Sequence, residues 1–332
     1  LAVCVCAVCC MCGSDSKTPD YEFPDGPDPD PDPQPGDYPA GLTVTEFADD
    51  LGGGKQCLGF VAVADLKANP KLRFNAVHLP QQKIPSRIHA EFASANRGTA
   101  CVTTNAGYWW AGNSLSLLVT GGAVKSIENQ TVTRNNQTVY PVRSSFGQMS
   151  SGKFETHWIY CVLDDGNKPY AFPSALDNDE RTNTYMSAPP TSKTPGAALW
   201  TPQEAVGGGP MLVREGKNVA VENYWKEVFD GGGIAGTSRQ PRTAIGATAD
   251  GKLILLVCDG RNMRGSAGFT LAELADKLIA LGAVDAVNLD GGGSSTMVGS
   301  DGKVLNRPSD TGSAEVIVER KISTAVVISE VN

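Results

Sequence analysis

Four short motifs in the C-terminal third of the chain combine aspartates, arginines and consecutive glycines. They are PRTAIG at 241–246, DGR at 259–261, NLDGGGSS at 288–295 and NRPSD at 306–310. Aspartates can serve as nucleophile, general base or general acid on an acetal-like carbon. Arginines hold phosphate or carboxylate oxygens, and consecutive glycines let backbone N–H groups approach an anion. The combination indicates a catalytic site for an anionic substrate. The alternative is structural, with tight glycine turns and an Arg242–Asp259 ion pair.

A hairpin is predicted to bring the first two motifs together. Asp250-Gly251 separates two β-like runs, and Asp-Gly is a strong signal for a two-residue turn. Antiparallel pairing about that turn places Arg242 opposite Asp259, at the end of the sheet away from the turn. We therefore expect this arginine and this carboxylate to share one site.

A strand–helix–strand unit is predicted to bring in the glycine loop. TLAELADKLIALG (270–282) has leucines at helical spacing, a capping box at its start and a glycine stop at its end. VDAVNLD (284–290) then predicts a strand parallel to the one before the helix, joined by a right-handed crossover. Ligands gather at the carboxyl ends of such strands. Those ends hold 259–261 on one strand and 288–295 on the other.

The whole chain is predicted to be one α+β domain behind a short head. Residues 41–332 are expected to form a mixed β-sheet with antiparallel hairpins, one C-terminal βαβ unit and few helices. Residues 1–12 are apolar and hold five of the nine cysteines. They resemble a bacterial lipoprotein signal ending at Cys12, the alternative being the tail of an ordinary secretory signal. Residues 13–40 read as an acidic, Pro-rich linker. We expect an exported protein, lipid-anchored in the bacterial cell envelope.

Charge and residue spacing disfavour several classes of protein. The net charge is -8, and residues 19–37 alone carry seven acids and no Lys or Arg, so the remainder is close to neutral. A nucleic-acid binder would usually show a basic patch, and no apolar run reaches the ~18 residues of a membrane-spanning helix. The three histidines and the four cysteines beyond the head show no metal-ligand spacing. A zinc site and a Ser–His–Asp hydrolase are therefore disfavoured, while one disulfide among those cysteines stays open.

At these motifs the chain resembles the phosphodiester glycosidase family. The resemblance extends over about residues 100–328 and also includes NAGYW (105–109) and GGGPMLV (207–213). It implies hydrolysis of the bond between a sugar's anomeric carbon, here of N-acetylglucosamine type, and a phosphodiester oxygen, giving free sugar and a phosphomonoester. The catalytic residues it implies are Asp290, Asp259 and Arg242. The substrate-binding residues it implies are Asn105, Arg261, Asn288, Gly292, Gly293, Ser294 and Ser295.

Asp290 is our expected attacking or water-activating group, with Asp259 orienting Arg242 or acting as the partner acid. The exchanged assignment stays open, and so does the choice between retention and inversion. No cofactor is expected. The alternative is a divalent cation held by both aspartates, as in a metal-dependent phosphodiesterase that cuts the P–O bond. A second alternative is a non-catalytic glycan-binding lipoprotein that stacks a sugar on the aromatic residues 108–110.

Overall fold

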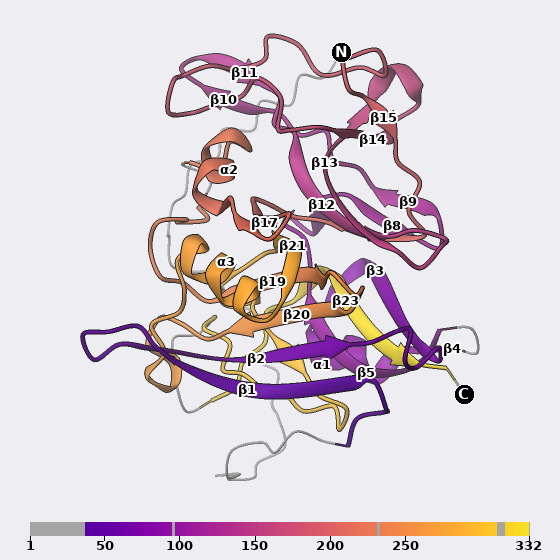
Figure 1. Cartoon of the computed structure of the whole chain (residues 1–332), viewed down its shortest axis with the longest axis vertical. Coiled ribbons are helices and arrows are strands. Elements are labelled where there is room, and N and C mark those ends of the chain that lie inside the picture. The colour runs from indigo at the N-terminus through magenta and orange to yellow at the C-terminus, as the bar shows by residue number, and fades with distance from the viewer. Residues whose placement is uncertain (1–36, 95–96, 231–232, 311–315, 332) are drawn as a thin grey trace.

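Figure 1 shows a computed structural model of the chain, which describes residues 37–94, 97–230, 233–310 and 316–331. The predicted signal segment at 1–12 and nearly all of the linker at 13–40 lie outside these residues. Both predictions therefore stay predictions. None of the helices in the described residues is long and apolar enough to cross a membrane.

Three β-sheets contain most of the described chain, and we call them the central, terminal and upper sheets. The central sheet has the order β1 (Leu42–Asp50), β2 (Gln56–Ala64), β20 (Leu253–Cys258), β19 (Arg242–Thr248), β21 (Ala283–Asn288), β17 (Met211–Arg214) and β18 (Lys217–Asn218). The terminal sheet has the order β22 (Met297–Val298), β5 (Gly98–Asn105), β23 (Ile322–Glu330) and β3 (Leu72–Lys83), with β4 (Ala93–Ser94) paired to β5.

The upper sheet lies above the other two in Figure 1. Its order is β15 (Ala198–Leu199), β14 (Lys168–Phe172), β13 (Phe154–Val162), β12 (Arg143–Gln148), β16 (Glu204–Gly207), β8 (Leu118–Thr120) and β9 (Ala123–Ser126). Two small hairpins pair β10 (Val132–Arg134) with β11 (Gln137–Val139) and β6 (Trp109–Trp110) with β7 (Asn113–Ser114). The α-helices of the described residues are α1 (Pro85–Glu91), α2 (Ala220–Lys226) and α3 (Leu271–Ala280). Short 3-10 turns are η1 (Leu163–Asp165), η2 (Met263–Gly265) and η3 (Gly292–Ser294).

The α+β prediction with few helices and antiparallel hairpins is confirmed, but the expected mixed sheet is not. Every pairing between the named strands of the described chain is antiparallel. The strands on either side of α3, β20 and β21, run in the same direction because both pair antiparallel with β19. The two strands are therefore parallel, as predicted, but β19 lies between them and they do not pair with each other.

The central sheet is buried on both faces. One face packs against the terminal sheet in a core that includes Phe60, Leu255 and Val326. The other face packs beneath α2 and α3 through residues such as Leu256 and Leu274. A strand covered on both sides needs apolar side chains at every position, which explains the unbroken run LILLVC of β20. The rigid sheet thereby fixes the strand ends that carry the motifs.

Both Asp-Gly turns contain three residues rather than two. Thr248 N–H donates to the Lys252 carbonyl at 2.9 Å, which leaves 249–251 as the turn. Gly299 N–H donates to the Lys303 carbonyl in the same way, at 2.9 Å, around 300–302. The closing glycines, 251 and 302, have φ of 87° and 80°, as three-residue turns with a left-handed last residue require. Each hairpin register is consequently one residue away from the one predicted.

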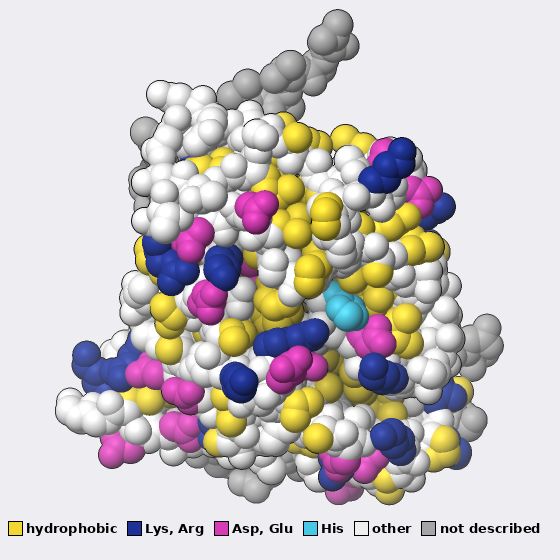
Figure 2. Space-filling view, turned by 45° about the horizontal axis from the view of Figure 1, so that its top comes forward, with side chains coloured by type: hydrophobic (Ala, Val, Ile, Leu, Met, Phe, Trp, Pro, Cys, Tyr) yellow, Lys and Arg dark blue, Asp and Glu magenta, His cyan; other side chains and the backbone are white. Residues whose placement is uncertain are grey.

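The predicted capping box of α3 is confirmed. Thr270 Oγ1 accepts from the Glu273 N–H at 3.1 Å, and the Glu273 carboxylate accepts from the Thr270 N–H at 2.9 Å. The helix is followed by Gly282 with φ of 90°, which fits the expected stop. On the surface face shown in Figure 2, basic and acidic side chains are interspersed, in keeping with the near-neutral charge of the chain beyond its head.

Candidate functional site

Asp290 is held where the central and terminal sheets end together. It follows β21, and its N–H donates to the Ala106 carbonyl at 2.9 Å, just beyond the end of β5. Asn105 Nδ2 donates to the Asp290 carbonyl at 2.6 Å. Asn105 therefore positions the backbone of the acid. Its own side chain is buried, and we assign it a positioning role in place of the predicted contact with substrate.

Asp290 as a residue is half-buried, while its carboxyl group is enclosed enough for burial to dominate its titration. Burial raises its pKa to about 6. The nearby Ser294 hydroxyl opposes this shift most, followed by the positive charge of Arg320. A carboxyl of this kind is largely ionised at pH 7 and takes up a proton just below it. It can therefore work as a nucleophile or base, or as an acid under slightly acidic conditions.

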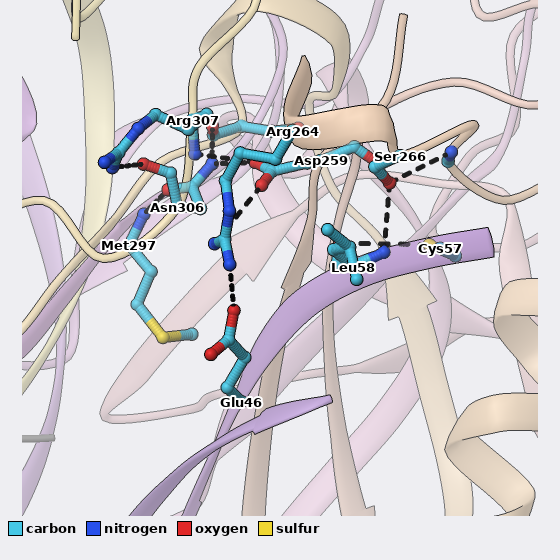
Figure 3. A network of polar contacts seen from close by, with 11 residues as sticks. Glu46, Cys57, Leu58, Asp259, Arg264, Ser266, Met297, Asn306 and Arg307 are labelled. Carbon is cyan, nitrogen blue, oxygen red and sulfur yellow. Dashed lines mark hydrogen bonds and ion pairs between the residues drawn. The ribbon is translucent and has the colours of Figure 1, made fainter. Parts of the chain in front are cut away.

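Asp259 is fully buried and bound into the framework (Figure 3). Its Oδ1 accepts from Asn306 Nδ2 at 3.1 Å and from the Arg307 N–H at 2.7 Å. Arg264 Nη1 lies 3.9 Å from Oδ2, and the same guanidinium pairs with Glu46 of β1. Burial raises the pKa of Asp259 to about 6 despite these donors. This geometry favours an organising role for Asp259 over direct attack on a substrate.

A continuous hydrogen-bond network joins the two aspartates. Asn306 Nδ2 donates to the Ser295 carbonyl at 2.9 Å. Thr243 Oγ1 lies 3.3 Å from Ser295 Oγ and 2.8 Å from Asn105 Oδ1. The structure thus brings the predicted residues 259, 290 and 292–295 into one region, through a threonine that the sequence analysis did not single out.

The glycine loop folds into η3 beneath two guanidinium groups. A methyl group on Gly292 would lie 3.1 Å from Arg261 Nη2, and one on Gly293 would lie 2.5 Å from Arg320 Nη2. Gly292 also has φ of 62°, a conformation that favours glycine. The Ser294 hydroxyl is buried and close enough to the Asp290 carboxyl to lower its pKa. Arg261 therefore lies against the loop that follows Asp290 and contains Gly292, Gly293 and Ser294.

Arg242 is not at this site, and its predicted pairing with Asp259 is wrong. It pairs with Cys258 because the turn contains three residues. Since strand side chains alternate between faces, the one-residue shift turns Arg242 toward α3. There its guanidinium donates to the carbonyls of Phe269, Ile234, Ala235 and Ser238 at 2.8–3.0 Å. Arg242 anchors a loop rather than binding an anion.

Asn288 also points away from the site. Its Nδ2 donates to Tyr108 Oη at 2.8 Å and to the Gly209 carbonyl at 3.0 Å, while Tyr108 donates to the same carbonyl at 2.6 Å. The Tyr108 hydroxyl is thereby paired with internal groups, and Tyr108 and Trp109 are both half-buried. Among residues 108–110, only Trp110 is strongly exposed, at 66%.

The sequence analysis missed three contributors to this region. Thr243 lies inside the motif PRTAIG. Had a three-residue turn been predicted, the Thr243 side chain would have been expected on the face of the sheet that carries the site. Asn306 lies inside the motif NRPSD, and its Oδ1 accepts from the Met297 N–H at 2.9 Å. Arg320 lies outside every motif, and the sequence around it carries no signal that separates it from a surface arginine.

The described residues contain no group of three or more His, Cys, Asp or Glu side chains that could hold a metal ion. Cys57, Cys101, Cys161 and Cys258 are buried and free.

Part of the chain is similar in sequence to known proteins. N-acetylglucosamine-1-phosphodiester alpha-N-acetylglucosaminidase of Homo sapiens is 39% identical over 90 residues, 27% of this chain and 17% of that protein. An uncharacterized SPbeta prophage-derived protein of Bacillus subtilis is 36% identical over 91 residues, 27% of this chain and 13% of that protein. The aligned segments thus span less than a fifth of these relatives.

Solved structures share the fold. The zebrafish N-acetylglucosamine-1-phosphodiester alpha-N-acetylglucosaminidase catalytic domain, auto-inhibited by its pro-peptide, superposes with a TM-score of 0.57 at 21% identity, covering 88% of this chain and 84% of that one. A putative exported protein of Burkholderia pseudomallei gives a TM-score of 0.51 at 16% identity, covering 82% and 74%. The sequence model of the phosphodiester glycosidase family matches residues 121–329, and the chain belongs to that family.

Proposed function

We propose that the chain is a glycoside hydrolase that cleaves a sugar-1-phosphodiester into free sugar and a phosphomonoester. The observation that carries the proposal is the placement of Asp290. Asp290 is half-buried, burial raises the pKa of its carboxyl to about 6, and the residue precedes a glycine loop that Arg261 overlies. A carboxyl group and a guanidinium at adjacent positions suit a reaction in which the sugar carbon is attacked while a phosphate departs.

In this mechanism Asp290 attacks the anomeric carbon or activates the water that does so. Arg261 stabilises the charge that develops on the departing phosphate. A phosphomonoester is a good leaving group, so the reaction needs little acid catalysis. Asp259, enclosed and hydrogen-bonded to Asn306 and Arg307, holds the adjoining loop.

For the sugar we propose an N-acetylglucosamine type. The support is that the vertebrate relatives, to which 90 residues of this chain align at 39% identity, are N-acetylglucosamine-1-phosphodiester alpha-N-acetylglucosaminidases. For the location we propose export and lipid attachment at Cys12, on the sequence pattern of residues 1–12. Replacing Cys12 with Ser should then move the protein from the membrane fraction to the soluble fraction, and unchanged fractionation would refute the anchor.

The test of activity compares Asp290→Asn with Asp285→Asn, a matched carboxylate on the same strand that pairs with Arg214 at 3.5 Å. The substrate is an alkyl diester of N-acetylglucosamine-1-phosphate. We expect the Asp290 variant to lose roughly 10²–10⁴-fold in kcat, and the Asp285 variant to stay within a few-fold of wild type. Equal sugar release by the Asp290 variant and wild type would remove this residue from the reaction.

Hydrolysis in oxygen-18 water separates the two possible bond cleavages. Label in the released sugar identifies C–O cleavage and supports the glycosidase. Label in the alkyl phosphate identifies P–O cleavage and refutes it in favour of the phosphodiesterase. Adding a chelator tests the divalent-cation alternative in the same assay, since loss of turnover that added Mg²⁺ restores would support a cation.

A further inference from the structure

An ion pair between Arg320 and Asp310 rests directly on the glycine loop. Arg320 Nε donates to Asp310 Oδ1 at 2.8 Å, and Nη2 contacts the same oxygen. A methyl group on Gly293 would lie 2.5 Å from Arg320 Nη2 and 2.6 Å from Asp310 Oδ1. The Arg320 and Asp310 side chains are 35% and 29% exposed to solvent. Both charged groups therefore lie against the loop and within reach of solvent.

The positive charge of Arg320 also lowers the pKa of Asp290 against the effect of burial. On the neighbouring glycine, Arg261 Nη2 lies 3.1 Å from the position of a methyl group on Gly292. Consecutive Cα atoms are about 3.8 Å apart, so two guanidinium groups approach the same short stretch of backbone. Two adjacent cations are unfavourable unless an anion lies between or beside them.

We propose that Arg320 binds the phosphate of the substrate and that Asp310 occupies the same guanidinium when no substrate is bound. The identity of the phosphate as part of a sugar diester rests on the proposed function. Two nitrogens of Arg320 share one oxygen of Asp310, whereas a phosphate offers a separate oxygen to each, the bidentate geometry that guanidinium groups prefer. Exposed ion pairs contribute only about 0–1 kcal/mol, so exchanging Asp310 for phosphate costs little.

This arrangement gives the site selectivity for phosphate-linked sugars. Arg261 and Arg320 would hold the phosphate from two sides over Gly292 and Gly293, with Asp290 at the adjoining sugar carbon. Asp310 would keep Arg320 over the loop between turnovers and keep it from pairing with Asp290. A neutral leaving group would gain nothing from Arg320.

The first test measures binding of inorganic phosphate to the full chain by titration calorimetry. We expect Arg320→Gln to weaken binding roughly tenfold to hundredfold, because a charge-assisted contact is lost. Asp310→Asn should tighten binding several-fold, because the internal competitor is neutralised. The matched control is Arg181→Gln, which breaks a similar exposed pair with Asp179 elsewhere on the surface and should change nothing. Unchanged affinity in Arg320→Gln, or weaker binding in Asp310→Asn, would overturn the proposal.

The second test compares KM for the alkyl phosphodiester with KM for an aryl N-acetylglucosaminide. Arg320→Gln should raise KM for the diester at least tenfold and leave KM for the aryl substrate within about twofold. Gly293→Ala keeps both charged residues and pushes them off the loop, so it should raise the same KM. Equal effects on both substrates would contradict phosphate recognition by Arg320.

The two proposals fail separately. Phosphate binding does not depend on turnover, so an inactive protein that loses phosphate affinity on Arg320→Gln would refute the proposed function and support the role of Arg320. An active protein indifferent to Arg320→Gln in both assays would retain the function and refute this inference.

Discussion

Replacing Glu128 with Gln should make the stability of this protein less sensitive to pH. The Glu128 side chain is 1% exposed, and neither carboxylate oxygen has a hydrogen-bond partner among the described residues. Burial raises its pKa from 4.5 to about 8, although the charge of Arg143 opposes the shift. Near neutral pH the folded protein therefore holds this carboxyl protonated, while the unfolded chain holds it ionised.

The sign and size of the effect follow from the two pKa values. The folded state binds the proton more tightly, so the contribution of Glu128 is fully present below pH 4.5 and is lost as the pH rises through about 8. One pKa unit corresponds to about 1.36 kcal/mol. Between pH 5 and pH 7 the wild type should thus lose up to about 2.7 kcal/mol through this group. The glutamine variant has no such proton to release.

Urea unfolding at pH 5 and pH 7 measures this difference directly. We expect the free energy of unfolding of Glu128→Gln, relative to wild type, to grow by about 2–3 kcal/mol between the two pH values. Glu222→Gln is the control, since this exposed glutamate pairs with Lys226 on the surface of α2, and its free energy should follow that of wild type. If Glu128→Gln and wild type lose stability in parallel, the buried carboxyl is not protonated and the reasoning is wrong.

Three further outcomes follow from the site. The kcat/KM of wild type should rise with pH through about 6 as Asp290 ionises; a fall through that pH would make Asp290 the acid instead. Asn306→Ala removes a donor from the buried Asp259 and should lower the free energy of unfolding by about 1–3 kcal/mol in urea titrations, with no change counting against the network. Arg242→Met should cost about 1–3 kcal/mol in the same titration, because four backbone carbonyls lose a charged donor; full stability would contradict an anchoring role.

Local sequence signals predicted the elements around the site well. The capping box of α3 depends on two side chains three residues apart, so it can be recognised without knowledge of the rest of the fold. The apolar run of β20 and the glycine after α3 are equally local. The order of the strands is not local, because β19 enters between β20 and β21 through pairings that no short motif encodes.

The placement of individual site residues depended on a quantity that the sequence leaves open, the number of residues in a turn. Asp-Gly is compatible with turns of two or three residues, and the choice decides which face every side chain of β19 occupies. With two, Arg242 would face Asp259. With three, Arg242 pairs with Cys258 and anchors the loop beneath α3, while the Thr243 hydroxyl contacts Asn105. A motif therefore predicts that a strand carries residue types suited to catalysis. The number of residues in the turn decides which of those side chains face the site. Arg320 illustrates the remaining limit, since its proposed role arises only from its position over Gly293.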